Sequence, residues 1–144
     1  MTKRAVGGGN LLILGATPAN TLRATEAAVE AMRAVPDAIM PFPGGIVRSG
    51  SKVGSKYKGA IASTNHLYCP TLKGAVDSAL GPDVTSVLEI VIDGLTSAAV
   101  AEAMRAGLKA IVELGPEQGA LRVSAGNYGG KLGKHHYRLR GLAP

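Results

Sequence analysis

The 144-residue sequence contains one cysteine and no tryptophan. Cys69 has no partner for a disulfide within the chain, and His66, His135 and His136 do not stand at a zinc-binding spacing. No apolar run approaches the roughly 20 residues of a membrane-spanning helix. The first ten residues lack the apolar stretch of a secretory signal. We therefore expect a cytoplasmic protein with no disulfide, no metal site and no membrane contact.

Acidic residues are absent from two long segments, between Asp37 and Asp77 and after Glu117. Ten of the sixteen basic residues lie in these segments. They are Arg48, Lys52, Lys56, Lys58 and Lys73 in the first, and Arg122, Lys131, Lys134, Arg138 and Arg140 in the second. Like charges held together repel one another unless a counter-ion offsets them, so the clustering favours an anionic ligand.

The composition, with 46% hydrophobic and 18% charged residues, is that of one globular domain. The apolar run at 10–15 indicates a strand, and Thr17 followed by Pro18 indicates a helix start. That helix is predicted to end near Val35 and Pro36. Its buried face is predicted at Leu22, Thr25, Val29 and Met32.

A second unit of the same kind follows, after a short strand predicted within 44–50. Its strand covers 86–95, its helix is capped by Thr96, and its last strand covers 120–125. The buried stripe of that helix is predicted at Val100, Met104, Leu108 and Ile111. Two such units match an α+β, ferredoxin-like split βαβ fold, with an antiparallel sheet and two helices on one face. The long insertion between the units is predicted at about 50–83, and residues 126–144 form a Gly/Lys-rich C-terminal extension.

Both faces of this predicted sheet are apolar. Alternation along 86–92 turns Ile90 and Ile92 toward the helices and leaves Glu89 on the other face. In the first strand, residues 11–14 are apolar on both faces. We therefore expect a partner subunit or another lobe to cover the face away from the helices. Glu89 is then either an ordinary solvated glutamate or a desolvated carboxyl group that exchanges protons near neutral pH.

Two functions suggested by the glycines and basic charge are disfavoured. Residues 126–131 and 50–56 both contain Gly and Lys, but neither has the spacing or the Ser/Thr of a phosphate-binding P-loop. An RNA-binding sheet needs aromatic side chains to stack bases, and aromatics make up 3% of this chain, outside the predicted core strands. We therefore predict no nucleic-acid partner, although a nucleic-acid-binding module remains the third hypothesis.

Three segments resemble one known family. They read RSGSKVGSKYKGAIASTNHLYCPTL at 48–72, LEIVIDGL at 88–95 and SAGNYGGKLGKHHYRLR at 124–140. In this order they closely resemble the C-terminal lobe of formylmethanofuran:tetrahydromethanopterin formyltransferase. Members of that family are about twice as long, because a second, similar lobe precedes this one.

The resemblance implies formyl transfer from methanofuran to N5 of tetrahydromethanopterin, with both compounds as substrates and no bound cofactor or metal. Glu89 matches the glutamate of the family motif and takes the catalytic role of proton acceptor. The implied substrate-binding residues are Lys52, Ser55, Lys56, Thr64, Asn65, His66, Ser124, Asn127 and Lys131. The implied partners are further copies of the chain, an N-terminal lobe, or subunits of a formyltransferase/hydrolase complex.

Two expectations and one alternative follow. Segments 50–58 and 126–134 are expected to lie near each other and form an anionic-ligand site, and the chain is expected to form an oligomer. The alternative is a non-catalytic lobe that binds the pterin or serves as a scaffold in a formyltransferase complex.

Overall fold

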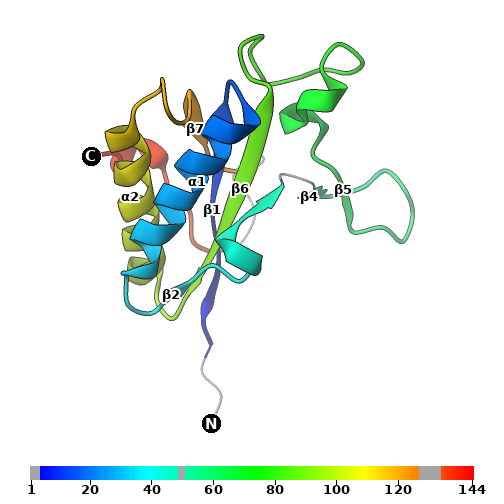
Figure 1. Cartoon of the computed structure of the whole chain (residues 1–144). Helices are drawn as coiled ribbons and strands as arrows, with labels where there is room; N and C mark the ends of the chain where they lie inside the picture. The colour runs from blue at the N-terminus through cyan, green and yellow to red at the C-terminus, as the bar shows by residue number, and fades with distance from the viewer. Residues whose placement is uncertain (1–3, 49–50, 127–133) are drawn as a thin grey trace.

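The chain forms two helices packed on one face of an antiparallel sheet, as seen in a computed structural model that describes residues 4–48, 51–126 and 134–144 (Figure 1). The helices are α1 (Pro18–Arg33) and α2 (Ser97–Leu114). The strands are β1 (Val6–Gly15), β2 (Ala38–Ile39), β3 (Val47–Arg48), β4 (Ser51–Val53), β5 (Ala62–Thr64), β6 (Ser86–Gly94) and β7 (Arg122–Ser124). Single 3-10 turns cover Pro43–Gly45, His66–Tyr68, Pro70–Leu72 and Leu139–Gly141. The predicted α+β class is confirmed.

The main sheet has the order β2, β6, β1, β7, and β3 pairs with the same edge of β6 as a second short strand. Every pairing in it is antiparallel. β4 and β5 form a separate hairpin beyond the β3 edge, within the segment that joins β3 to β6 (Figure 1). We call residues 51–85 the excursion, and its bounds lie close to the predicted insertion.

The two helices begin where the sequence predicts. In α1 the hydroxyl oxygen of Thr17 accepts the N–H of Asn20 at 3.1 Å, and in α2 that of Thr96 accepts the N–H of Ala99 at 3.1 Å. Such caps satisfy backbone donors that have no partner inside the helix. Gly115, with a φ of 77°, ends α2.

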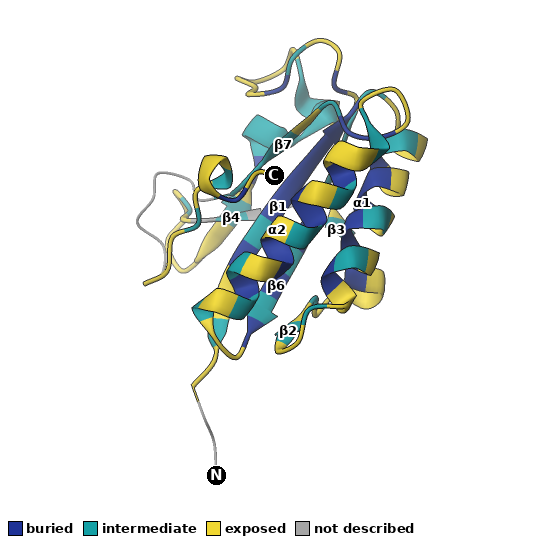
Figure 2. Ribbon diagram, turned by 90° about the vertical axis from the view of Figure 1, so that its left-hand side faces the viewer, coloured by how far each residue is buried: buried dark blue, intermediate teal, exposed yellow. Residues whose placement is uncertain are grey.

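The main core lies between the helices and the sheet (Figure 2). Ile90 and Ile92 of β6 point into it, as alternation predicts. The predicted stripe of α2 is buried there. In α1, however, Leu22 is 43% exposed, so its placement on the buried face was wrong. The buried face of α1 is turned toward Thr21, Ala24, Thr25, Ala28, Val29 and Met32.

A second, smaller core lies on the other side of the sheet, which we call the open face. Leu12 and Leu14 of β1 are buried there against Leu80 and Val84 of the excursion. Val87, Tyr68 and Leu121 complete this cluster. The expectation that a partner or another lobe covers this part of the sheet was therefore wrong, because the chain folds its own excursion over Leu12 and Leu14.

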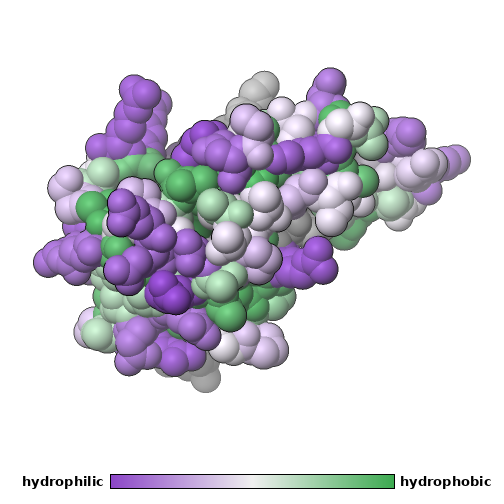
Figure 3. Space-filling view, turned by 45° about the horizontal axis from the view of Figure 1, so that its top comes forward, coloured by the Kyte–Doolittle hydropathy of each residue, from purple (hydrophilic) through white to green (hydrophobic). Residues whose placement is uncertain are grey.

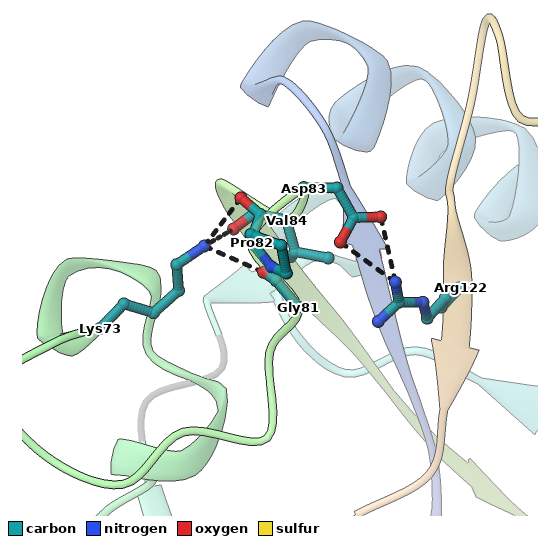
Figure 4. Close-up of polar contacts among 6 residues, drawn as sticks. All are labelled: Lys73, Gly81, Pro82, Asp83, Val84 and Arg122. Atoms are coloured by element: carbon teal, nitrogen blue, oxygen red, sulfur yellow. Dashed lines mark hydrogen bonds and ion pairs between the residues drawn. The ribbon is translucent and has the colours of Figure 1, made fainter.

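Polar contacts at the end of the excursion hold this cover in place (Figure 4). The Lys73 ammonium donates to the backbone oxygens of Gly81 at 3.0 Å, Pro82 at 3.3 Å and Val84 at 2.7 Å. Arg122 of β7 forms an ion pair with Asp83, with both carboxylate oxygens within 3.1 Å of one guanidinium nitrogen. Because the ion-paired side chains are about half exposed, we assign most of the anchoring to Lys73.

The C-terminal residues pack on the helix side. Leu142 is buried in the main core, and the Tyr137 hydroxyl lies 3.0 Å from the Ser97 hydroxyl. This part of the predicted Gly/Lys extension therefore packs against the fold.

No helix in the described ranges is long and apolar enough to cross a membrane.

On the face in Figure 3, apolar residues form small areas between hydrophilic ones. The largest exposed apolar side chains of the excursion are Tyr57 and Ile61, at the loop between β4 and β5. Lys56 lies over the ring of Tyr57, 5.4 Å from its centre.

Substituting Lys73 tests the anchor of the excursion. Lys73→Met keeps the aliphatic stem and removes the donor to three carbonyl groups, so we expect the free energy of unfolding to fall by about 1 to 3 kcal/mol. Urea unfolding followed by circular dichroism measures this change. Lys109→Met is the matched control, because Lys109 is exposed on α2 and its pair with Glu113 is 3.8 Å long. Equal stability of the two variants would contradict the anchoring role.

Candidate functional site

The candidate site is built around Glu89, a half-buried carboxylate in the middle of β6. Its cross-strand neighbours are Leu12 of β1 and Val47 of β3. Directly opposed residues in a sheet share a face, so Glu89 lies on the open face beside the buried Leu12. The predicted orientation of Glu89, away from the helices, is thus confirmed.

The surroundings of Glu89 favour its protonated form. Burial among apolar strand residues raises the pKa of its carboxyl group, and the hydrogen bond from Asn10 lowers it by a smaller amount. The Asn10 amide donates to the Glu89 carboxylate at 2.8 Å. A carboxyl group of raised pKa accepts and releases a proton closer to neutral pH than an ordinary glutamate.

Ser124 lies at the same position along the sheet. It pairs with Leu12 from the β7 side, while Glu89 pairs with Leu12 from the β6 side. Two strand spacings therefore separate the backbones of Ser124 and Glu89, roughly 10 Å. Leu12, which the excursion buries, thus lies between the two residues, and Ser124 and Glu89 flank it on the same face.

The remaining predicted binding residues lie mainly in the excursion. Lys52 is half-buried on β4, Lys56 is exposed, and the Ser55 hydroxyl accepts the N–H of Tyr57 at 3.1 Å. Thr64 ends β5 and is exposed. The hairpin therefore presents hydroxyl and ammonium groups beyond the β3 edge of the sheet.

Asn65 and His66, two further predicted binding residues, come directly after Thr64 in the chain. Asn65 is fully buried, and His66 begins the 3-10 turn His66–Tyr68 with a half-buried side chain. Asn127 and Lys131 lie outside the described residues, as does most of segment 126–134, so the expected proximity of that segment to 50–58 stays a prediction.

Sequence reasoning missed Asn10. Its side-chain oxygen accepts the N–H of Gly126 at 2.9 Å, while its nitrogen donates to Glu89. One signal was available, because Asn10 is a polar residue at the start of an apolar strand and shares the alternation of Leu12 and Leu14.

Within the described ranges, no three His, Cys, Asp or Glu side chains come together in a way that could hold a metal ion.

Comparison with known proteins identifies the family. The profile described as "FTR, proximal lobe" matches residues 1–142. This chain belongs to the formylmethanofuran:tetrahydromethanopterin formyltransferase family. The resemblance noted in the sequence is thereby confirmed.

Individual family members are similar in sequence to this chain over nearly its whole length. A relative from Methylorubrum extorquens, named as one of the subunits of a formyltransferase/hydrolase complex, is 66% identical over 96% of this chain and 44% of its own length. The formylmethanofuran–tetrahydromethanopterin formyltransferase of Methylobacillus flagellatus is 61% identical over 95% and 45%. The chain thus spans less than half the length of these relatives.

Solved structures give the same result. The crystal structure of the Methylorubrum extorquens formyltransferase/hydrolase complex, in complex with methylofuran, matches with a TM-score of 0.90 at 66% identity over 96% of this chain and 45% of that one. The formyltransferase of Methanosarcina barkeri matches with a TM-score of 0.87 at 44% identity, over 96% and 46%.

The raised pKa of Glu89 gives a testable pH dependence of stability. The folded state holds the Glu89 proton more tightly than the unfolded chain does, so this group's contribution is complete at low pH and is lost as the pH rises through the folded pKa. Glu89→Gln removes that loss and keeps an oxygen that accepts from Asn10. We expect the stability of the variant relative to the parent to increase from pH 4 to pH 7, starting near the ordinary glutamate pKa of about 4.3.

Urea unfolding at several pH values measures this difference. Glu26→Gln, at an exposed position of α1, is the control and should leave the pH dependence unchanged. A constant difference between Glu89→Gln and the parent across this range would show that Glu89 is not desolvated.

Proposed function

We propose that this chain forms a lobe of an enzyme that transfers a formyl group from formylmethanofuran to N5 of tetrahydromethanopterin. The observation that carries the proposal is Glu89, a half-buried carboxylate on the open face whose pKa burial raises. Family membership supplies the reaction, since relatives with 61% identity bear the name of this formyltransferase. The similar structure that contains methylofuran supports the substrate class.

The chemistry of formyl transfer requires a proton acceptor. When N5 attacks the formyl carbon, a C–N bond forms, the carbonyl oxygen gains negative charge and N5 becomes a protonated amine. Glu89 takes that proton. The bond to the methanofuran nitrogen then breaks, and the leaving amine receives the proton from Glu89 as the carbonyl re-forms. A single carboxyl group with a raised pKa serves both steps.

Binding of the substrates requires groups that recognise anions, because both substrates carry carboxylates. Lys52, Ser55 and Lys56 of the hairpin supply ammonium and hydroxyl groups. Ser124, across Leu12 from Glu89, is the proposed hydroxyl donor at the reacting end. Thr64, Asn65 and His66, together with Asn127 and Lys131, keep the binding roles that the family motif implies.

We assign residues 1–144 to a single ferredoxin-like lobe with the excursion as its insertion. The strand order β2, β6, β1, β7 supports this class, since the first strand of each βαβ unit lies in the centre of the sheet. The two helices on one face agree with it.

The partners of this lobe follow from the family. Relatives are more than twice as long as the matched part, so an N-terminal lobe is one proposed partner. The 66% identical relative is named as part of a formyltransferase/hydrolase complex, so the other subunits of such a complex are the next candidates. The same observation favours the second candidate function, a non-catalytic lobe that binds the pterin or serves as a scaffold.

Further copies of the chain are the third proposed partner. Sedimentation velocity at micromolar concentration should give a species heavier than the 14.6 kDa monomer. A monomer alone at this concentration would contradict self-association of the chain.

A chimera tests the catalytic function directly. Residues 1–142 replace the matching lobe of the Methylobacillus flagellatus formyltransferase, and transfer from formylmethanofuran to tetrahydromethanopterin is measured. We expect an active chimera, in which Glu89→Gln keeps pterin binding and lowers kcat by roughly a hundred- to ten-thousand-fold, as for a lost general base. Glu26→Gln should be as active as the parent chimera.

The possible failures are distinct. A folded chimera that binds the pterin but does not turn over would favour the non-catalytic lobe. Full activity of Glu89→Gln would refute the role of Glu89 and leave family membership intact.

A further inference from the structure

The Asn10 side chain connects the Glu89 carboxylate to the beginning of the glycine-rich segment. Its amide nitrogen donates to Glu89 at 2.8 Å, and its oxygen accepts the Gly126 N–H at 2.9 Å. These contacts join residues 79 and 116 positions apart. Both ends of one short, half-buried side chain are therefore used, and this fixes its orientation.

A β-bulge in β1 determines the face of the sheet on which the Asn10 side chain lies. The register of β1 against β6 shifts between Gly7 and Gly9, and Gly8 has a φ of 126°, which favours glycine. Gly9 then faces the helices, where a Cβ atom would come within 2.5 Å of Val100. Asn10, the next residue, must point to the open face. There it is opposite Val91 and diagonal to Glu89, a separation that two polar side chains can bridge.

No other charged group in the described part of the chain lies at hydrogen-bond or ion-pair distance from Glu89. Its neighbours across and along the sheet are the apolar Leu12, Val47, Val87 and Val91. Titratable groups on the elements that line this face or pack on it include Asp93 of β6, Arg122 of β7 with its partner Asp83, and His66, Tyr68 and Lys73 of the excursion. Asn10 is thus the one described polar side chain that contacts the carboxylate.

We propose that Asn10 is a positioning residue, which holds the Glu89 carboxylate in one orientation on the open face and ties that orientation to Gly126. The proposal rests on the proposed function of Glu89. In that role the second carboxylate oxygen of Glu89 stays directed to the substrate, because Asn10 occupies the first. The hydrogen bond also favours the ionised form that accepts the proton from N5.

The first measurement uses the unaltered 144-residue chain. Side-chain amide resonances of Asn10 should shift with pH along the same titration curve as the Glu89 carboxyl carbon, and this shift should vanish in Glu89→Gln. Asn20, whose amide donates to the backbone oxygen of Glu117, is the internal control. Asn10 resonances that do not follow Glu89 would overturn the proposal without any variant at Asn10.

Two substitutions separate the two hydrogen bonds. Asn10→Asp keeps an oxygen for the Gly126 N–H and replaces the donor to Glu89 by a second carboxylate. Asn10→Leu removes both contacts at similar volume. We expect the pKa of Glu89 to rise further in both variants, since each loses the hydrogen bond that stabilises the ionised form. Asn20→Asp adds the same charge at the start of α1 and should leave the Glu89 titration unchanged.

In the chimera, Asn10→Leu should lower kcat roughly ten- to a hundred-fold and move the acid limb of the pH profile toward higher pH. A purely structural role would not move that limb. An unchanged Glu89 titration in both Asn10 variants would overturn the proposal. If that titration shifts while turnover in Glu89→Gln stays at the parent level, the hydrogen bond stands, but Glu89 is not catalytic and the positioning role is refuted.

Discussion

The antiparallel pairing of β1 with β6 is the constraint on which the rest of the structure depends. These two long strands lie in the centre of the sheet, and alternation along each one divides its side chains between two cores. Ile90 and Ile92 enter the helix side, while Leu12 and Glu89 share the open face. A slip of one residue would place the carboxylate in the apolar core under the helices.

The excursion shields part of the open face from water. Leu80 and Val84 bury Leu12, the residue that lies between Glu89 and Ser124. Lys73 donates to three backbone oxygens of this cover, all in the segment that returns to β6. Burial of the sheet and the raised pKa of the carboxyl group therefore share a physical origin, the removal of water from this side of the sheet.

Patterns confined to a few neighbouring residues were readable in the sequence. The caps at Thr17 and Thr96 and the orientation of Glu89 follow from local hydrogen bonding and strand alternation. The burial of Leu22 was predicted wrongly, because the helix turns the small residues Ala24 and Ala28 toward α2 and the sheet. A hydrophobic pattern marks a helix reliably, but tertiary packing selects which of several apolar faces is buried.

The sequence by itself determined the α+β class, the family and the carboxylate at the centre of β6, because these depend on local periodicity and on motifs of contiguous residues. Only the tertiary structure decided what covers Leu12 and which side chain orients Glu89. Both depend on contacts between residues far apart in the chain, such as Asn10 with Gly126. The bulge at Gly8 sets the register that makes the contacts of Asn10 possible. Glycines within a strand are typical of bulges, but the pairing with β6 decides where the register shifts.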